Sequence, residues 1–425
     1  MMFDILQQEF KTNRSMDPTW LSDFRDHNYR KFEELGFPTT KSETWRYMDL
    51  NHLRDLCYSL PKSEVSSEIF TSLRFKTHKR TLCCSFLNGK LKTVESGGVD
   101  LSSLGLDAFG EESTWLEERL DGGDISSHPF RALNGAFLDH VVTIRSESLK
   151  GAFDEVILDF VWTSAEEAMI ASPRVMIEVQ TGQELQVMNI HRGVACQKAM
   201  VNLATDIWVK PGGRLNYLKY EENQETHIDS TRVSVGRDGY FRGSYYGFGS
   251  AVSRVSFEAD LIGSGAECFL DGLQITSRNE HSDFMSEIRH MATNTTSHEY
   301  VKGVLGGKSS SAFYGYVFVD AEAQKTDAVQ TNRNLLLSQG AVANSRPQLE
   351  IYADDVKCAH GSTVGQLDES QVFYLRSRGF TEAKARAELT KAFVAELFSH
   401  LSNREVSSWL MAKAEARIAE SLGEA

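Results

Sequence analysis

The sequence predicts a mainly β protein with helical regions at both ends. Short runs of alternating apolar and polar residues follow one another between about residues 151 and 366. No helix of crossover length separates these runs, which disfavours a sheet built from βαβ units. A glycine precedes successive hydrophobic runs at steps of 26 to 31 residues: Gly182, Gly213, Gly239 and Gly265. This repeat favours a β-solenoid, whose coils bury their apolar sides against each other, although periodicity alone does not exclude a β-sandwich.

Residues 1–150 are expected to form a mixed, partly helical N-terminal domain. Asp17 offers an N-cap acceptor and Pro18 suits the first position of a helix, so a helix should begin there. Aromatic residues then recur at near-helical spacing until Gly36, a typical helix end. A second, short helix is expected near Trp115, inside a stretch rich in Gly, Ser, Asp and Glu.

Residues 151–366 are expected to form the β core. The strand candidates are short, rich in β-branched and aromatic residues, and bounded by glycine or asparagine. They include 175–179, 215–220, 232–235 and 255–262.

Residues 367–425 are expected to form a C-terminal helical domain with two amphipathic stretches separated near Asn403. Two helices that follow a β body either pack back on that body or present a face to a partner. The apolar positions recur at helical spacing: Ala385, Leu389, Ala392, Phe393, Leu397 and Leu401, then Val406, Trp409, Leu410, Ile418 and Leu422.

The composition excludes several classes of protein. The chain has 425 residues, and 45 Lys and Arg against 59 Asp and Glu give a formal net charge of -14, which disfavours generic nucleic-acid binding. We see no signal peptide and no run of about 18 uncharged apolar residues. The six cysteines form no C-x-x-C pair. We therefore expect a reduced, cytoplasmic protein.

Familiar catalytic motifs are missing. Residues 303–309 resemble a phosphate-binding loop, but Lys302 stands where the first glycine is required, so a β-turn is expected instead. The residues His281, Asp283, His290 and His298 could supply metal ligands, but their wide, irregular spacing favours structural or surface histidines.

The segment around Cys358 and His360 is more distinctive. On a strand, residues two apart point to the same face, so the thiol and the imidazole would lie side by side. This pair suits iron or an iron–sulfur cluster, and the imidazole or Lys357 could lower the thiol pKa. The alternative is a small buried cysteine beside a hydrogen-bonded histidine.

Five segments together resemble the SufB/SufD family of iron–sulfur cluster assembly proteins. They are irregular signatures that occur in the family's order: 43–47, 332–338, 345–351, 354–363 and 373–379. Within the family, the Lys-Cys-x-His-Gly form is similar to the SufD branch. The SufB branch has a cysteine in the segment that reads Thr-Asn-Arg-Asn here, and this chain has none.

The resemblance implies a right-handed parallel β-helix core between N-terminal and C-terminal helical domains. It also implies a non-catalytic subunit that pairs with SufB through the β-helix core. The SufC ATPase, where the ATPase activity resides, would dock on the C-terminal helices, for which the candidates are Phe393, Leu397, Trp409 and Leu410.

The resemblance further implies that iron or a nascent cluster is bound transiently at the interface with SufB. His360 is the candidate ligand, and Cys358 is either a second ligand or a structural neighbour. A cysteine desulfurase system would supply sulfur, a flavin could bind at the level of the complex, and the chain could form a homodimer in isolation.

Two other functions stay open. One is a β-solenoid carbohydrate-active enzyme that uses paired carboxylates, for which Asp354 and Asp355 are candidates, although adjacent strand residues face opposite ways. The other is a structural interaction module without metal chemistry of its own.

Overall fold

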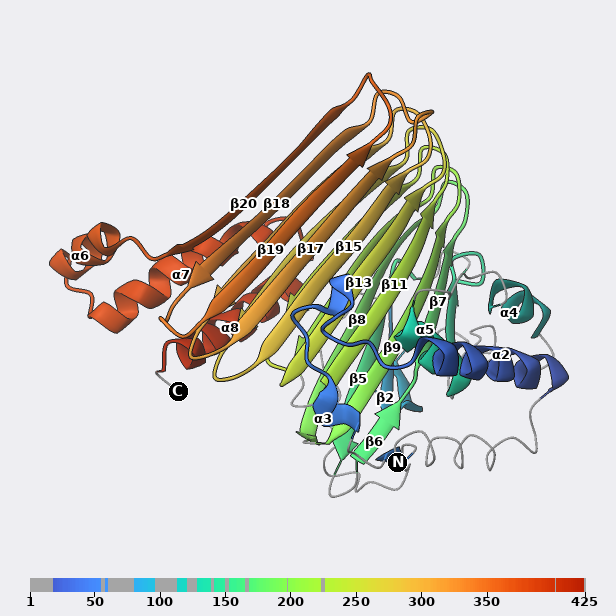
Figure 1. Ribbon diagram of the computed structural model, residues 1–425, viewed down its shortest axis with the longest axis horizontal. Coiled ribbons are helices and arrows are strands. Elements are labelled where there is room, and N and C mark those ends of the chain that lie inside the picture. The colour runs from blue at the N-terminus through green and yellow to red at the C-terminus, as the bar shows by residue number, and fades with distance from the viewer. Residues whose placement is uncertain are drawn as a thin grey trace.

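The protein is a parallel β-solenoid of about seven turns with helices before and after it (Figure 1). The computed structural model describes residues 18–54, 58–59, 80–95, 113–120, 128–138, 141–149, 153–164, 168–196, 198–222, 226–401 and 403–423. The strand pairs that join successive turns are parallel, which excludes the β-sandwich and confirms the predicted fold class. Within these ranges no helix is long and apolar enough to cross a membrane.

Two sheets line the solenoid, and each turn contributes one strand to each sheet. The first sheet, sheet A, contains β1 (Tyr58–Ser59), β4 (Val141–Arg145), β6 (Ala168–Ala171), β7 (Arg174–Val179), β9 (Ala199–Val209), β11 (Thr226–Val235), β13 (Val252–Leu261), β15 (His281–His290), β17 (Ser310–Val319) and β19 (Val342–Ile351). The second sheet, sheet B, contains β3 (Lys90–Glu95), β2 (Thr81–Leu87), β5 (Glu155–Ser164), β8 (Glu184–Cys196), β10 (Arg214–Glu222), β12 (Tyr240–Gly247), β14 (Glu267–Thr276), β16 (Thr296–Leu305), β18 (Asp327–Leu336) and β20 (Lys357–Gln366). The four strand candidates from the sequence lie in β7, β10, β11 and β13.

The glycine repeat marks the turns between the sheets. Gly182 and Gly265 have φ of 68° and 74°, a left-handed conformation that favours glycine. Gly263 is required for a different reason, because a Cβ there would lie 2.0 Å from the backbone nitrogen of Arg237 in the preceding turn. The glycines at these turns therefore serve two needs: a left-handed conformation at Gly182 and Gly265, and close stacking of one turn on the next at Gly263, which is not part of the repeat.

The N-terminal helices cover the outer face of sheet A. Helix α2 (Thr19–Leu35) starts one residue later than predicted, because Pro18 is its N-cap and not its first helical residue, and Gly36 caps its end as predicted. Asp17 lies outside the described residues. The predicted helix near Trp115 is α4 (Ser113–Leu120), and the remaining elements are a 3-10 helix η1 (Glu43–Trp45), α3 (Asn51–Arg54) and α5 (Pro129–Ala136). Arg131 of α5 pairs with the buried Asp206 of β9, which ties this domain to the sheet.

The C-terminal region contains α6 (Glu369–Ser377), α7 (Glu382–Phe398) and α8 (Arg404–Ser421). Apolar side chains of α7 and α8 form one core cluster with the outer face of sheet B. Lys302 of β16 donates from its ammonium to the carbonyl of Phe393 at 2.6 Å and pairs with Glu396 at 3.0 Å. Helix α6 lies at the far end of this region, away from the solenoid (Figure 1).

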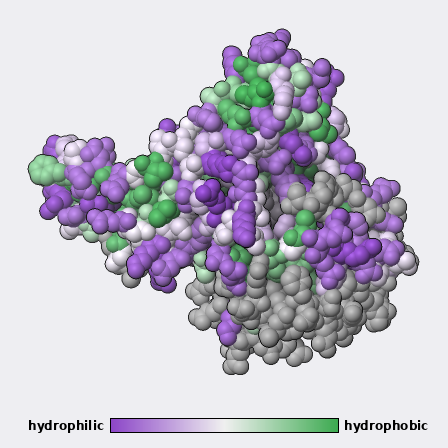
Figure 2. Space-filling view, viewed as in Figure 1, coloured by the Kyte–Doolittle hydropathy of each residue, from purple (hydrophilic) through white to green (hydrophobic). Residues whose placement is uncertain are grey.

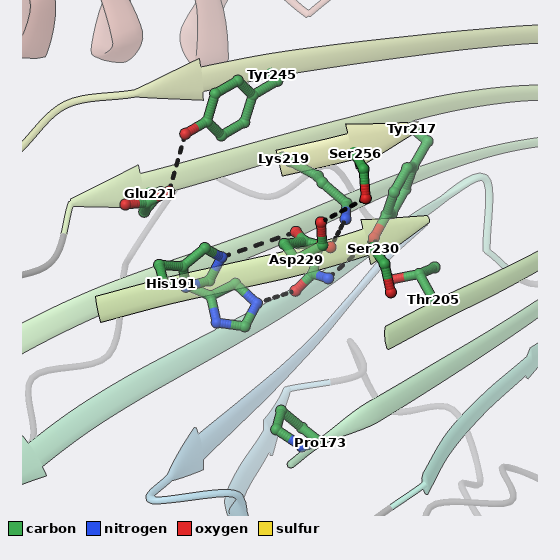
Figure 3. A network of polar contacts seen from close by, with 12 residues as sticks. Pro173, His191, Thr205, Tyr217, Lys219, Glu221, Asp229, Ser230, Tyr245 and Ser256 are labelled. Atoms are coloured by element: carbon green, nitrogen blue, oxygen red, sulfur yellow. Dashed lines mark hydrogen bonds and ion pairs between the residues drawn. The ribbon is translucent and has the colours of Figure 1, made fainter. Parts of the chain in front are cut away.

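The interior of the solenoid contains a buried polar network (Figure 3). The ammonium of Lys219 pairs with the carboxylate of Asp229, and both side chains are at most 3% exposed. The hydroxyl of Tyr245 donates to the carboxylate of Glu221 at 2.9 Å. His191 lies in the same network, where burial lowers its pKa well below the ordinary value. Buried charges are tolerated where they are paired in this way, so the network fixes which strands face each other.

Gly263→Ala should destabilise the protein by about 1–3 kcal/mol, because the new methyl group collides with backbone that cannot move away. Gly361→Ala is the control, since a Cβ there meets nothing within 4 Å. The free energy of unfolding of both variants can be measured by urea denaturation. Equal stability of the two variants would contradict the close stacking of turns.

Candidate functional site

The last turn of the solenoid is exposed. Strand β20 pairs with β18 on one side, and almost all of its residues are exposed. Val342 of β19 and Val364 of β20 are 52% and 48% exposed. Among the described residues no strand is paired with the outer edge of β20, which lies at the margin of the molecule in Figure 1. Such an edge offers unpaired backbone groups to another chain. We call β19 and β20 together the open end.

Cys358 and His360 lie on the face of β20 that continues the inner face of β18 at this open end, with Cys358 partly buried and His360 exposed. In register, Cys358 lies beside the buried Ala328, and His360 lies beside the buried Gln330. Ser362, the next residue of the same face, donates to the hydroxyl of Ser345 in the opposite sheet at 2.7 Å. The prediction that the thiol and the imidazole share one face of a strand is confirmed.

The thiol of Cys358 is not activated by its surroundings. Partial burial raises its pKa, and the nearby Asp327 carboxylate adds to this, while a hydrogen bond from the backbone of Ala328 opposes it. The expectation that His360 or Lys357 lowers this pKa is therefore wrong, because desolvation outweighs any nearby positive charge. A bound metal would have to displace the thiol proton.

The earlier histidine candidates do not converge. His281 pairs with Asp283 at 2.8 Å at one end of β15, whereas His290 is buried at its other end, where burial lowers its pKa to about 4. His298 lies on β16 in the other sheet and is half exposed. In the part of the chain that the structure describes, no three His, Cys, Asp or Glu side chains are grouped so that they could hold a metal.

The remaining motifs have structural positions. The glycine-rich segment 303–309 spans the end of β16 and the turn into β17, as expected for a β-turn. Asp354 and Asp355 lie in the exposed connection between β19 and β20, where the amide of Asp355 donates to the side chain of Gln324 at 2.9 Å.

The four side chains considered for ATPase docking are engaged within the chain. Leu397 and Leu410 are fully buried against sheet B, and Phe393 and Trp409 are partly buried in the same cluster. The apolar positions of α7 and α8 therefore pack on the β core, which was one of the two alternatives, the other being a face presented to a partner. Helix α6, in contrast, exposes Phe373 and Tyr374.

Two groups of residues were not among the catalytic, metal-binding or docking candidates predicted from the sequence. Glu299 and Gln330 lie in the same register row as His360, on β16 and β18. The repeat length could have found them, because positions 299, 330 and 360 are spaced by about one turn of the solenoid. Phe373 and Tyr374 of α6 are 72% and 57% exposed, and Figure 2 shows apolar surface among the C-terminal helices.

Iodoacetamide should alkylate Cys358 slowly at neutral pH, because its raised pKa leaves little thiolate. The rate should keep rising as the pH passes about 8.5, the ordinary value for a thiol. Peptide mapping by mass spectrometry separates Cys358 from the other cysteines, and the urea-unfolded chain is the control. A rate that levels off below about pH 8 would contradict the raised pKa.

Comparison with known proteins agrees with this geometry. The family model described as SUF system FeS cluster assembly, SufBD core domain, matches residues 160–393. The chain is 26% identical to the iron–sulfur cluster assembly protein SufD of Escherichia coli, covering 90% of each chain. It is 25% identical to an iron–sulfur cluster assembly SufBD family protein of Synechocystis, with coverage of 86% and 84%. It is 22% identical to SufD of Bacillus subtilis, covering 96% of each. The chain therefore belongs to the SufBD family of iron–sulfur cluster assembly proteins.

Proposed function

We propose that this protein acts as the SufD subunit of a cluster assembly complex and pairs with a SufB subunit through the open end. The observation that carries this proposal is the exposed last turn, which presents a thiol and an imidazole at its mouth. Covering that turn would satisfy the unpaired edge of β20 and enclose both side chains between two subunits.

The chemistry of the two side chains supports a shared site. Imidazole and thiolate are good ligands for iron and for iron–sulfur clusters. His360 and Cys358 supply only two such ligands, whereas a cluster needs more. The partner would therefore complete the ligand set, and iron or the nascent cluster is a transient cargo. Sulfur would come from a cysteine desulfurase, and a flavin, if one takes part, is assigned to the complex and not to a site in this chain.

The C-terminal helices are proposed to dock the SufC ATPase in the cytoplasm. Helix α6 presents Phe373 and Tyr374, and aromatic side chains of this kind anchor protein interfaces. Helices α7 and α8 are fixed to the solenoid. Tyr246 of sheet B donates to the carbonyl of Leu397 at 3.2 Å, and Arg417 pairs with Glu280 in the turn between β14 and β15. A movement of the ATPase would thus reach the solenoid through a rigid connection.

Val364→Glu should weaken pairing with SufB by more than about tenfold, because an unpaired charge would be buried at the interface. Ile262→Glu is the matched control, since Ile262 is 58% exposed in a turn away from the open end. Pairing can be measured with purified subunits by calorimetry. Loss of affinity in both variants, or in neither, would refute the proposed interface.

His360→Ala should reduce cluster assembly by the purified complex by at least about tenfold while the complex stays intact. His298→Ala is the control, because His298 is half exposed on the outer side of sheet B. Assembly is followed anaerobically by visible absorbance and acid-labile sulfide. Undiminished assembly by His360→Ala would favour the structural module without metal chemistry.

The double variant Phe373→Ala/Tyr374→Ala should lower the affinity for the ATPase by about tenfold or more, because two exposed anchors are lost. The solenoid should remain folded, since neither side chain is part of its core. Met291→Ala, which removes an exposed apolar side chain from a solenoid turn, should leave binding unchanged. Unchanged binding by the double variant would place the docking surface elsewhere.

A further inference from the structure

A row of polar side chains continues from His360 into the solenoid. His360, Gln330 and Glu299 are register partners on β20, β18 and β16, so they lie one behind the other on the same face. Ser286 of β15 reaches the same place from the opposite sheet, where it interacts with the Glu299 carboxyl. Glu299, Gln330 and Ser286 are at most 2% exposed. The row therefore connects the mouth of the open end with a fully buried carboxyl group.

The polar atoms of this row lack ordinary partners. Both oxygens of Glu299, both polar atoms of the Gln330 amide and the hydroxyl of Ser286 make no hydrogen bond of standard geometry with any described residue. Burial raises the pKa of Glu299 to about 7. The side chains of Ser286 and Gln330 partly oppose this rise in pKa, so both lie close to the Glu299 carboxyl group. Buried polar groups in native proteins are nearly always hydrogen-bonded, and an exception calls for an explanation.

In nearby rows of the solenoid interior, the buried side-chain amides are hydrogen-bonded. Gln274 donates its amide to Ser282 at 2.6 Å, and Asn334 donates to Asn332 at 2.7 Å. The solenoid interior can therefore satisfy buried amides close to the open end. Single unpartnered atoms also occur deeper in the solenoid, on His227 and Thr231, but in the row behind His360 three side chains that lie together, Glu299, Gln330 and Ser286, all lack partners.

The chemistry of an amide suggests what completes the row. A glutamine side chain has a donor end and an acceptor end, and the donor end suits the Glu299 carboxylate. This leaves the carbonyl oxygen of Gln330 for another donor. Neighbouring strands lie about 4.8 Å apart, so the imidazole of His360 on the next strand is within reach of that oxygen once the exposed ring turns inward.

We propose that Gln330 and Glu299 are positioning residues for His360. The carbonyl of Gln330 accepts the imidazole N–H, and the Glu299 carboxylate, together with Ser286, holds the amide in the orientation that does so. A ligating histidine normally gives its second N–H to such an acceptor, which fixes the tautomer and leaves the other nitrogen for the metal. This role for Gln330 and Glu299 rests on the proposed function, in which His360 binds iron or a cluster.

The proposal can be tested on the isolated full-length chain without iron. Histidine is labelled with ¹⁵N, and the two tautomers of His360 are quantified by long-range ¹H–¹⁵N NMR at about pH 8.5, two units above the ordinary pKa of a histidine side chain. The signal is assigned by its loss in His360→Asn. We expect one tautomer to dominate, and Gln330→Leu to change the tautomer ratio about fivefold, the effect of losing one hydrogen bond. Gln330→Glu keeps an acceptor and should restore the ratio.

Glu299→Leu separates positioning from a structural role. Leucine fills a similar volume without burying a carboxyl group, so the melting temperature should not fall, yet the His360 tautomer ratio should shift because the Gln330 amide is no longer held. Gln274→Leu is the matched control, since it removes a buried amide from a neighbouring row and should leave His360 unchanged. An unchanged ratio in Gln330→Leu and Glu299→Leu, or an equal shift in Gln274→Leu, would overturn the proposal.

The outcome is independent of cluster assembly. If the tautomer ratio shifts as expected but His360→Ala assembles clusters normally, the hydrogen-bonded row stands and the proposed function fails. If assembly needs His360 but the ratio does not respond to Gln330 or Glu299, the proposed function stands and the positioning role is refuted.

Discussion

The in-register stacking of parallel strands is the constraint on which this structure depends. Each strand of an inner turn satisfies its backbone groups on the turns before and after it, so the last turn is left with one edge unpaired. The close approach of Gly263 to the backbone of Arg237 shows how tightly successive turns fit. Stacking must stop somewhere, and it stops at β20, where an exposed edge and the interior rows of side chains are left open together. The candidate site follows from that ending.

The helices make the two ends of the solenoid different. The N-terminal helices cover sheet A around Asp206, and α7 and α8 cover sheet B around Lys302. Neither group covers β20. The coupling of α7 and α8 to sheet B is polar as well as apolar, because Lys302, itself buried, bonds to both the backbone and a carboxylate of α7. Helices α7 and α8 and sheet B therefore form one connected body.

The local chemistry of the site was only partly predictable. That Cys358 and His360 share a face followed from the period of a strand. The direction of the Cys358 pKa shift did not follow, because desolvation by the preceding turn is a tertiary effect that adjacent sequence does not report. For the same reason Leu397 and Leu410, apolar at helical spacing, could equally have faced a partner or the sheet.

The sequence by itself determined the period of the turns, the strand and helix types and the family, because these depend on local backbone preferences, alternation of apolar residues and motif order. Helix α2 begins within one residue of the start that its flanking proline indicates and ends at the glycine that caps it. Only the tertiary structure decided which end is open, which apolar faces are already covered, and that Glu299 and Gln330 lie behind His360. Those properties arise from contacts between residues about thirty positions apart, and stacking, not sequence proximity, brings such residues together.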